Sequence, residues 1–268
     1  MKGFLIVIVL VCAAGLYCAS VALYAFVLMR RRPLARLYAE RAAQEDFCPL
    51  AELPDELVLD ILLAEDADFY EHPGVIWSAV REAAWTNLRA GRILWGGSTI
   101  TQQLVKNLYF RFRHSLARKA AELIITRAAE RKLGKDKILE LYLNIIDFGN
   151  GIYGIADAAR FYFGKEVRSL TENQMLLLAF IPKAPTVGNP VQHPDVFERC
   201  RDRRLDALVR QKRMPAEKAD GSRVWKADCL DPELRKNDEY TRNYPQDVVL
   251  VNERFGPNPT IPGGYEPW

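Results

Sequence analysis

The first 29 residues contain the longest apolar run of the chain. Residues 3–29 include no charged side chain, no proline and no asparagine. As an α-helix this run would be about 40 Å long, which is enough to cross a bilayer. A cleaved signal peptide is the alternative, but its apolar region would be shorter, and no convincing A-x-A cleavage site precedes the following arginines. The pattern favours an uncleaved transmembrane anchor.

Beyond the anchor, apolar residues recur with the period of amphipathic helices, and convincing alternating runs typical of strands are missing. The sequence therefore predicts a mainly α protein. Gly91 and Gly134 are helix-stop signals, and Pro182 ends a third helix. The expected helices cover residues 54–65, 76–90, 115–133, 171–181 and 196–211, with further helices starting at Thr99 and at a capping Asp136.

The chain of 268 residues is long enough for one sizeable domain with extensions. We divide it into a transmembrane anchor (1–29), a short connector (30–50), a folded domain (51–212) and a C-terminal extension of unknown role (213–268). Asn144–Gly154 is expected to be a glycine-rich loop.

Two T-x-x-Q sequences, Thr99 with Gln102 and Thr171 with Gln174, predict capping boxes at helix starts. The helix after Thr171 is apolar on all sides but too short to span a bilayer. We therefore expect it to be the core helix.

The stretch that begins at Gly97 is too rich in hydroxyls and amides for a plain packed helix. Gly96 and Gly97 would let the backbone approach a ligand closely. The first free N–H groups of the helix would form an anion site. The pattern predicts a surface for a phosphate or a sugar, and a well-capped surface helix is an equally supported alternative. The candidate binding residues here are Gly97, Ser98, Thr99, Gln102, Gln103, Lys106 and Asn107.

Composition narrows the range of functions that the sequence supports. A formal net charge of +3 is too small to indicate nucleic-acid binding. No C-x-x-C pair occurs and the three histidines are far apart, so a zinc site is not expected. Cys200 and Cys229 can pair if the domain is exported, and the sequence leaves this open.

Five segments in order resemble the motifs of the peptidoglycan glycosyltransferases, the polymerase module of bifunctional penicillin-binding proteins and of their monofunctional relatives. One such motif can arise by chance, but five in order over residues 51–210 hardly can. The resemblance implies a lysozyme-like fold with a smaller mobile lobe. No transpeptidase motif set follows the domain, which predicts a monofunctional protein. The segments are Glu65–Gly74 (E-D-x-x-F-x-x-H-x-G), Gly97–Asn107, Arg118–Glu122 (R-K-x-x-E), Lys137–Gly154 and Leu170–Pro190.

Glu65 ends an apolar stripe, and such surroundings raise the pKa of a carboxylate toward the range of a general base. On local grounds alone, a solvated helix-end glutamate or an acidic cluster with Asp66 and Asp68 is the better-supported alternative. The resemblance implies that Glu65 takes the proton from the 4-hydroxyl of an acceptor N-acetylglucosamine. The oxygen then attacks C1 of the donor N-acetylmuramic acid with inversion, and undecaprenyl pyrophosphate leaves.

A pyrophosphate leaving group needs cations aimed at its developing charge. Lys106, Arg118 and Lys119 are the candidates, although the last two can simply form intrahelical pairs with Glu122. The resemblance makes Glu122 a second essential glutamate, which orients these basic groups or holds a divalent ion such as Mg²⁺ or Mn²⁺. We expect no tightly bound cofactor.

The chain differs from its relatives at several donor-site positions. His114 stands where relatives commonly carry an arginine assigned to the phosphates, and Arg113 is a candidate substitute. Ile76 replaces a common aspartate, and Glu82 stands where a basic residue is frequent. These differences leave the predicted reaction class unchanged.

The predicted protein is a membrane-anchored enzyme that polymerises lipid II. The expected partners are lipid II, the nascent glycan strand, membrane lipids, and transpeptidases or division proteins, but no nucleic acid. The alternatives are a lytic enzyme of lysozyme-like fold and a non-catalytic lipid II-binding scaffold. Positive charges after the anchor, from Arg30 to Arg36, would keep the domain in the cytoplasm by the positive-inside rule. Long domains translocate largely regardless of charge, so the predicted function decides for an extracytoplasmic domain on the inner membrane.

Overall fold

The computed structural model describes residues 2–90, 98–110, 115–183, 190–191 and 194–223. Over these residues the chain is helical and has no β-strand; an isolated bridge joins Asp147 and Tyr153. The mainly α prediction is confirmed, whereas the mobility of a smaller lobe stays a prediction. The α-helices are α1 (Lys2–Arg31), α2 (Leu34–Ala42), α3 (Asp55–Glu65), α4 (Trp77–Ala90), α5 (Ile100–Tyr109), α6 (Leu116–Leu133), α7 (Lys135–Ile145), α8 (Ile155–Phe163), α9 (Glu172–Phe180), α10 (Pro194–Arg210) and α11 (Ala216–Arg223). The short 3₁₀ helices are η1 (Leu50–Glu52), η2 (Val167–Ser169) and η3 (Ile181–Lys183).

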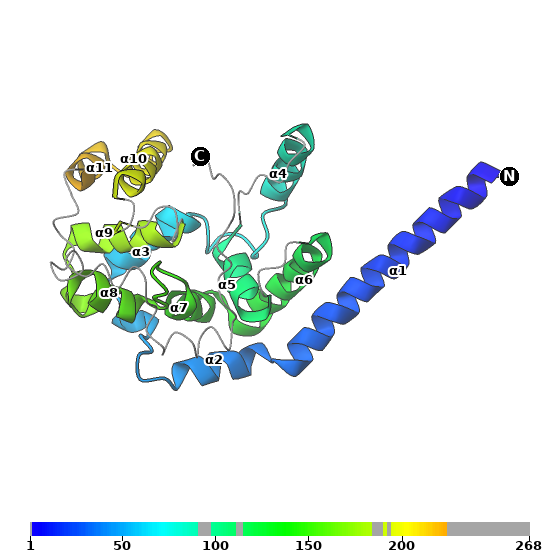
Figure 1. Cartoon of the computed structure of the whole chain (residues 1–268), viewed down its shortest axis with the longest axis horizontal. Helices are drawn as coiled ribbons and strands as arrows, with labels where there is room; N and C mark the ends of the chain where they lie inside the picture. The colour runs from blue at the N-terminus through cyan, green and yellow to red at the C-terminus, as the bar shows by residue number, and fades with distance from the viewer. Residues whose placement is uncertain (1, 91–97, 111–114, 184–189, 192–193, 224–268) are drawn as a thin grey trace.

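Helix α1 extends away from the helical body and carries the N-terminus at its far end (Figure 1). Among the described residues it forms the one segment long and apolar enough to cross a membrane. Its C-terminal third packs on α6, where Val21 and Ala25 are buried. The apolar helix is therefore continuous with the body and joined to it by packing.

The predicted connector, residues 30–50, is part of the folded body. It contains α2 and is fastened to the end of α7 through Asn144. The Arg41 Nε donates to the Asn144 carbonyl at 3.0 Å, and the Cys48 N–H donates to Asn144 Oδ1 at 2.8 Å. Asn144 itself lies inside α7, so the predicted loop from Asn144 to Gly154 starts later, after Ile145.

The core forms where α3 packs against α9, with α5, α7 and α8 closing around them. Helix α9 is buried along its whole apolar run from Met175 to Phe180, which confirms it as the core helix. The largest fully buried side chains are those of Tyr142, Tyr162, Phe69 and Phe148.

Both predicted capping boxes are confirmed, with Thr99 at the start of α5 and Thr171 at the start of α9. Ser115 caps α6 as predicted by accepting the Arg118 N–H. The predicted Asp136 cap is wrong. Gly134, at φ +76°, ends α6 and begins α7, and Asp136 lies in the first turn of α7, where its carboxylate accepts the Tyr70 hydroxyl at 3.1 Å.

The predicted C-terminal extension begins as folded structure. Helix α11 packs beside α10, as Figure 1 shows. Residues 224–268, which include Cys229, lie outside the described residues, so its pairing with Cys200 stays a prediction.

Candidate active site

Three helices meet around Glu65, the last residue of α3. Its side chain is only 7% exposed. From α5, Gln103 Nε2 donates a hydrogen bond to Glu65 Oε2 at 2.8 Å. From α7, the fully buried Tyr142 donates its hydroxyl to Gln103 Oε1 at 3.4 Å. The Glu65 carboxylate is thus held by the Gln103 amide, and Tyr142 fixes the orientation of that amide.

Tyr142 acts in this chain as a hydrogen-bond donor. Burial raises the pKa of its hydroxyl well above the ordinary value, and the carboxylates of Glu65 and Asp66 raise it further. The hydroxyl keeps its proton, so the Gln103 amide points its oxygen at Tyr142 and its nitrogen at Glu65. Sequence reasoning assigned Gln103 to the substrate, and it placed Tyr142 inside the motif at residues 137–154 without giving it a role.

The loop after Glu65 is locked onto the start of α5 by Asp66. The Ile100 N–H donates to Asp66 Oδ2 at 3.0 Å, and His72 Nε2 lies 2.9 Å from Asp66 Oδ1. The Gly74 N–H donates to His72 Nδ1 at 3.0 Å. Because Nδ1 accepts, Nε2 carries the ring proton and donates it to Asp66. This fixes one neutral tautomer of His72 and joins the loop to the helix.

Gly74 completes the same attachment. Its carbonyl accepts the Thr99 hydroxyl at 2.7 Å. Its φ is +83°, and a Cβ placed there would lie 2.6 Å from the Glu130 Cγ. Only glycine fits both the backbone conformation and the space.

The predicted anion site at the start of α5 is not open to a ligand at its first N–H group. There the bound anion is the Asp66 carboxylate of the chain itself. The Gln102 N–H donates to the Thr99 hydroxyl at 3.2 Å, and the Gln102 side-chain oxygen accepts the Thr99 N–H. Thr99 and Gln102 are both 2% exposed, so the structure gives them the role of fixing where α5 begins. Their contact with a substrate stays a prediction.

Lys106 lies one turn farther along α5. Although its side chain is exposed, protein atoms crowd the ammonium group, and this desolvation lowers its pKa. The carboxylates of Glu122 and Glu65 oppose that shift, whereas the cations Arg118 and Lys119 add to it. The ammonium group of Lys106 is therefore within electrostatic reach of both predicted catalytic glutamates.

Glu122 on α6 is paired on both oxygens. Arg118 Nη1 lies 2.9 Å from Oε2, and Lys119 Nζ lies 2.5 Å from Oε1. The Lys119 ammonium also donates to the Ser98 hydroxyl at 3.3 Å, beside the start of α5. The intrahelical pairs expected from the spacing do form, but Glu122 is only 2% exposed, so they are not a solvated surface feature. A buried carboxylate here holds two cations in place toward Lys106.

The residues around Glu122 do not fit a divalent cation. A metal ion would have to displace the two cations that already occupy its oxygens. Across the part of the chain that the structure describes, no group of three or more His, Cys, Asp and Glu side chains could hold a metal ion.

The structure describes only some of the remaining predicted residues. Asn107 is half-buried on α5. Gly97, Arg113 and His114 lie outside the described residues, so their predicted roles stay predictions. Glu82 is exposed on α4.

Asp147, in the loop after α7, was missed by sequence reasoning. Burial raises its pKa to about 6, a hydrogen bond from the Gly149 N–H counteracts this, and the charge of Lys106 also lowers it. The structure thus adds a third carboxyl group to the surroundings of Lys106. Its one sequence signal was a charge in an otherwise apolar stretch.

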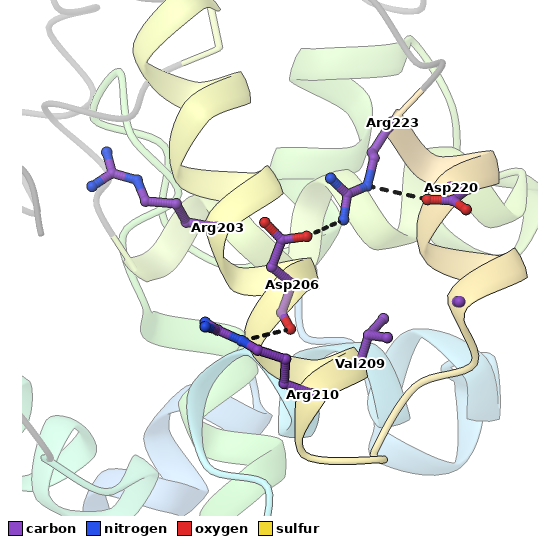
Figure 2. A pocket seen from close by; sticks show the side chains of 7 residues that line it. Arg203, Asp206, Val209, Arg210, Asp220 and Arg223 are labelled. Carbon is purple, nitrogen blue, oxygen red and sulfur yellow. Dashed lines mark hydrogen bonds and ion pairs between the residues drawn. The ribbon is translucent and has the colours of Figure 1, made fainter.

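A separate hollow of about 630 Å³ lies between α10 and α11. Figure 2 shows Arg223 paired with two aspartates of this hollow: it lies 2.5 Å from Asp206 and 3.5 Å from Asp220. None of the predicted site residues lines this hollow. It is therefore distinct from the site around Glu65.

Comparison with known proteins gives consistent results. Residues 30–209 match the family described as Transglycosylase. A protein from Cupriavidus necator that is provisionally named a transglycosylase is 38% identical over 211 residues, which is 78% of this chain and 88% of that protein. Penicillin-binding protein 1F of Bacillus subtilis is 40% identical over 69% of this chain and 26% of its own length.

Penicillin-binding protein 1A of Aquifex aeolicus is 44% identical over 65% of this chain. The chain spans 24% of the length of that protein and about as little of the other penicillin-binding relatives it matches. Among solved structures, penicillin-binding protein 1A from Haemophilus influenzae has a TM-score of 0.38 and 20% sequence identity, over 78% of this chain and 21% of that one.

Proposed function

The chain belongs to the transglycosylase family, and we propose that it is a peptidoglycan glycosyltransferase that polymerises lipid II into linear glycan strands. The observation that carries the proposal is the joint placement of Glu65 and Lys106. A buried carboxylate held by Gln103 and a desolvated ammonium group lie within electrostatic reach of each other. A group-transfer site with a pyrophosphate leaving group needs a base and a cation in this relation.

In the proposed reaction, Glu65 accepts the proton from the 4-hydroxyl of the acceptor N-acetylglucosamine. The freed electron pair of that oxygen forms the new bond to C1 of the donor N-acetylmuramic acid. The bond from C1 to the pyrophosphate oxygen breaks with inversion, and its electron pair leaves on undecaprenyl pyrophosphate. The hydrogen bond from Gln103 holds the Glu65 carboxylate in place before the proton is taken.

Charge develops on the pyrophosphate as the bond to C1 breaks. We assign Lys106 to meet that charge, with Arg118 and Lys119 as further cations whose charges are coupled to Lys106. Glu122 holds both of these side chains, which keeps them from collapsing onto other acceptors. This preorganisation costs nothing at the moment of reaction, which is how such sites stabilise transition states.

We also propose that α1 anchors the protein in the cytoplasmic membrane with residues 30–268 outside the cytoplasm. The support is the length and apolar composition of α1 and the lipid-linked substrate of the proposed reaction. The test fuses alkaline phosphatase, or a fluorescent protein that matures only in the cytoplasm, after Trp268. Phosphatase activity without fluorescence is expected, and fluorescence without phosphatase activity would refute the orientation.

The experiment for the proposed activity supplies the full chain in detergent with purified lipid II and separately with finished glycan. We expect glycan polymer from lipid II and no cleavage of finished glycan. The Glu65→Gln variant should lose at least about a hundredfold in rate, since it lacks the basic oxygen. Glu71→Gln, which changes an exposed carboxylate of the following loop, is the matched control. Cleavage of finished glycan would instead assign a lytic enzyme, and turnover of neither substrate would assign a scaffold.

A further inference from the structure

Phe110, the residue that follows α5, contacts both the anchor helix and a cation of the candidate site. Its ring contacts Tyr24 of α1, with the two ring centroids 6.4 Å apart and the planes tilted by 50°. The guanidinium carbon of Arg118 on α6 lies over the same ring, 5.8 Å from its centroid. Phe110 therefore connects α1 with the side chain that pairs with Glu122.

The backbone around Phe110 is fastened in place. Its own N–H donates to the Lys106 carbonyl at 3.0 Å. Arg32, at the junction of α1 and α2, donates through Nη1 to the Leu108 carbonyl at 2.7 Å, and its own carbonyl accepts the Tyr109 hydroxyl at 2.6 Å. Leu108 lies in the last turn of α5, where carbonyls lack partners within the helix. Two hydrogen bonds that run in opposite directions thus fix the end of α5 to the end of the anchor helix.

The hydrogen bonds of Arg118 do not fix its guanidinium by themselves. Among the described residues, its side chain donates one hydrogen bond, from Nη1 to Glu122 Oε2 at 2.9 Å, and its Nε is buried without a hydrogen-bond partner. A single bond at one end of the group leaves it free to pivot. The negative face of an aromatic ring attracts a guanidinium within about 6 Å. The Phe110 ring therefore supplies the second contact that fixes the orientation of Arg118.

We propose that Phe110 is a positioning residue for the reaction: the face of its ring holds the Arg118 guanidinium in the orientation in which it pairs with Glu122 and meets the leaving pyrophosphate. The proposal rests on the proposed function in that it treats Arg118 as one of the cations for the pyrophosphate. It also gives α1 a part in the site beyond membrane anchoring, because Tyr24 and Arg32 hold the segment that carries Phe110.

The alternative is a ring that only fills space beside α1, since Phe110 is half-buried. The two roles require different properties of the ring. Packing depends on its volume, whereas attraction to a guanidinium depends on the negative charge of its face. Pentafluorophenylalanine keeps nearly the same shape and reverses the sign of that charge. The role of Phe110 can therefore be tested without removing the ring.

The direct test measures how accessible Arg118 is in the full chain in detergent, without any substrate. Phenylglyoxal modifies accessible guanidinium groups, and mass spectrometry of the digested protein gives the labelling rate of each arginine. Arg118, whose side chain is 12% exposed, should react slowly in the wild type. Arg168, whose side chain is 65% exposed, is the internal standard, and every rate is expressed relative to it.

Replacing Phe110 with pentafluorophenylalanine should raise the labelling rate of Arg118 by about two- to thirtyfold, the range that corresponds to the loss of a cation–π contact. Phe110→Leu should raise it at least as much. Phe110→Tyr and Phe110→Trp keep a negative ring face and should stay near the wild-type rate. The fluorinated ring also covers the case in which Phe110→Leu fails to fold. If the pentafluorophenylalanine protein labels like the wild type, the ring acts by its shape alone and the proposal is wrong.

Phe47→Leu is the matched control for Phe110→Leu. Phe47 is also half-buried, but its ring meets Tyr38 edge to face, with the centroids 6.3 Å apart. Phe47→Leu should lower the melting temperature and leave the labelling rate of Arg118 unchanged. If it exposes Arg118 as much as Phe110→Leu does, the effect is a general loosening of the fold and the proposal is wrong.

The part given to α1 is tested with Tyr24→Leu. Without the Tyr24 ring, Phe110 loses its support from the anchor helix, so the labelling rate of Arg118 should rise, but by less than in Phe110→Leu. Tyr17→Leu changes an exposed ring on the free part of the same helix and should have no effect. An unchanged rate in Tyr24→Leu would overturn the part given to α1.

Activity provides the second readout. In the lipid II assay, kcat of the pentafluorophenylalanine protein should fall by about two- to thirtyfold, whereas KM should change less, because the charge on the leaving pyrophosphate develops in the transition state. Phe110→Tyr should retain most of the wild-type kcat. An unchanged kcat in the pentafluorophenylalanine protein would overturn the part of Phe110 in the reaction. If the wild-type protein does not polymerise lipid II while the labelling of Arg118 still follows the ring, the proposed function is wrong and the hold of Phe110 on Arg118 stands.

Discussion

The side-chain amide of Gln103 donates to the carboxylate of Glu65 across 2.8 Å, from one helix to the end of another. The hydroxyl of Tyr142 holds the other end of that amide. The contact joins α3, α5 and α7 at the one carboxylate that the proposed reaction requires as a base. The bond therefore fixes the position of that side chain.

Replacing Gln103 with leucine should therefore slow polymerisation. Hydrogen bonds to charged groups contribute about 1.5–3 kcal/mol, so kcat at neutral pH should fall by about tenfold or more. Gln211→Leu, at an exposed position after α10, is the control. An unchanged kcat would show that Gln103 does not serve Glu65.

Lys106→Ala should lower kcat by about 100- to 1,000-fold, because the leaving pyrophosphate loses a cation worth about 3–4 kcal/mol. Burial lowers the pKa of Lys106. The wild-type enzyme should therefore lose activity on the alkaline side at a lower pH than an ordinary lysine would give. Lys106→Arg should keep the charge and move this alkaline limb upward. The measurement is the kcat profile from neutral to alkaline pH, and an alanine variant with wild-type kcat would remove Lys106 from the mechanism.

Asp66→Asn should destabilise the loop between α3 and α4. The aspartate accepts hydrogen bonds from His72 and from the Ile100 N–H, so an amide would turn one nitrogen toward a donor. His72 cannot compensate by changing tautomer, because its other nitrogen accepts the Gly74 N–H. We expect a loss of about 1–3 kcal/mol in the free energy of unfolding.

Denaturant unfolding checks the effect of Asp66→Asn. Asp68→Asn breaks only the partly exposed pair with Arg213 and should cost less than about 1 kcal/mol. Equal losses in the two variants would contradict the role given to Asp66.

Asp60 should make stability depend on pH. Burial raises its pKa from 3.8 to about 6, more than the charge of Lys218 lowers it. Between these two pH values the folded state binds more protons than the unfolded state. The free energy of unfolding therefore falls as pH rises through this range. Asp60→Asn should therefore gain stability relative to the wild type from pH 4 to 6, by up to about 3 kcal/mol, and then level off.

The comparison is made by chemical denaturation of both proteins across this range. Glu56→Gln, which removes the more exposed partner of Lys218, is the control and should not show the same trend. A constant difference between wild type and Asp60→Asn at every pH would contradict the assignment.

Local signals in the sequence were sufficient for the helix starts. The capping boxes at Thr99 and Thr171 depend on residues three apart, and both form as predicted. Asp136 failed as a cap because Gly134 adopts the positive φ that ends one helix and begins the next, which composition alone does not reveal. The motifs predict catalytic roles for Glu65 and Glu122; both side chains are buried in the structure, and their roles stay predictions.

Contacts between distant positions could not be predicted in the same way. Nothing local to residues 30–50 indicates that Asn144, about a hundred positions away, holds them to the end of α7. Arg204 on α10 donates a hydrogen bond to the Leu63 carbonyl on α3, and these two residues are 141 positions apart in the sequence. The substrate role predicted for Gln103 followed from its helix face, and the sequence did not show that Glu65 lies opposite.

In the proposed membrane anchoring, the packing of α1 on α6 would set the distance between the body and the membrane. Phe4 to Ser20 are exposed and free of the body, whereas Val21 and Ala25 are buried in it. The free part of the helix is about 26 Å long, close to the roughly 30 Å of a bilayer's hydrocarbon core. Because the free segment is no longer than the hydrocarbon core, once inserted it would hold the body against the headgroup layer. A flexible tether would let the site move away from the bilayer, whereas this arrangement would keep it at the membrane surface, where the proposed lipid-linked substrate diffuses in two dimensions.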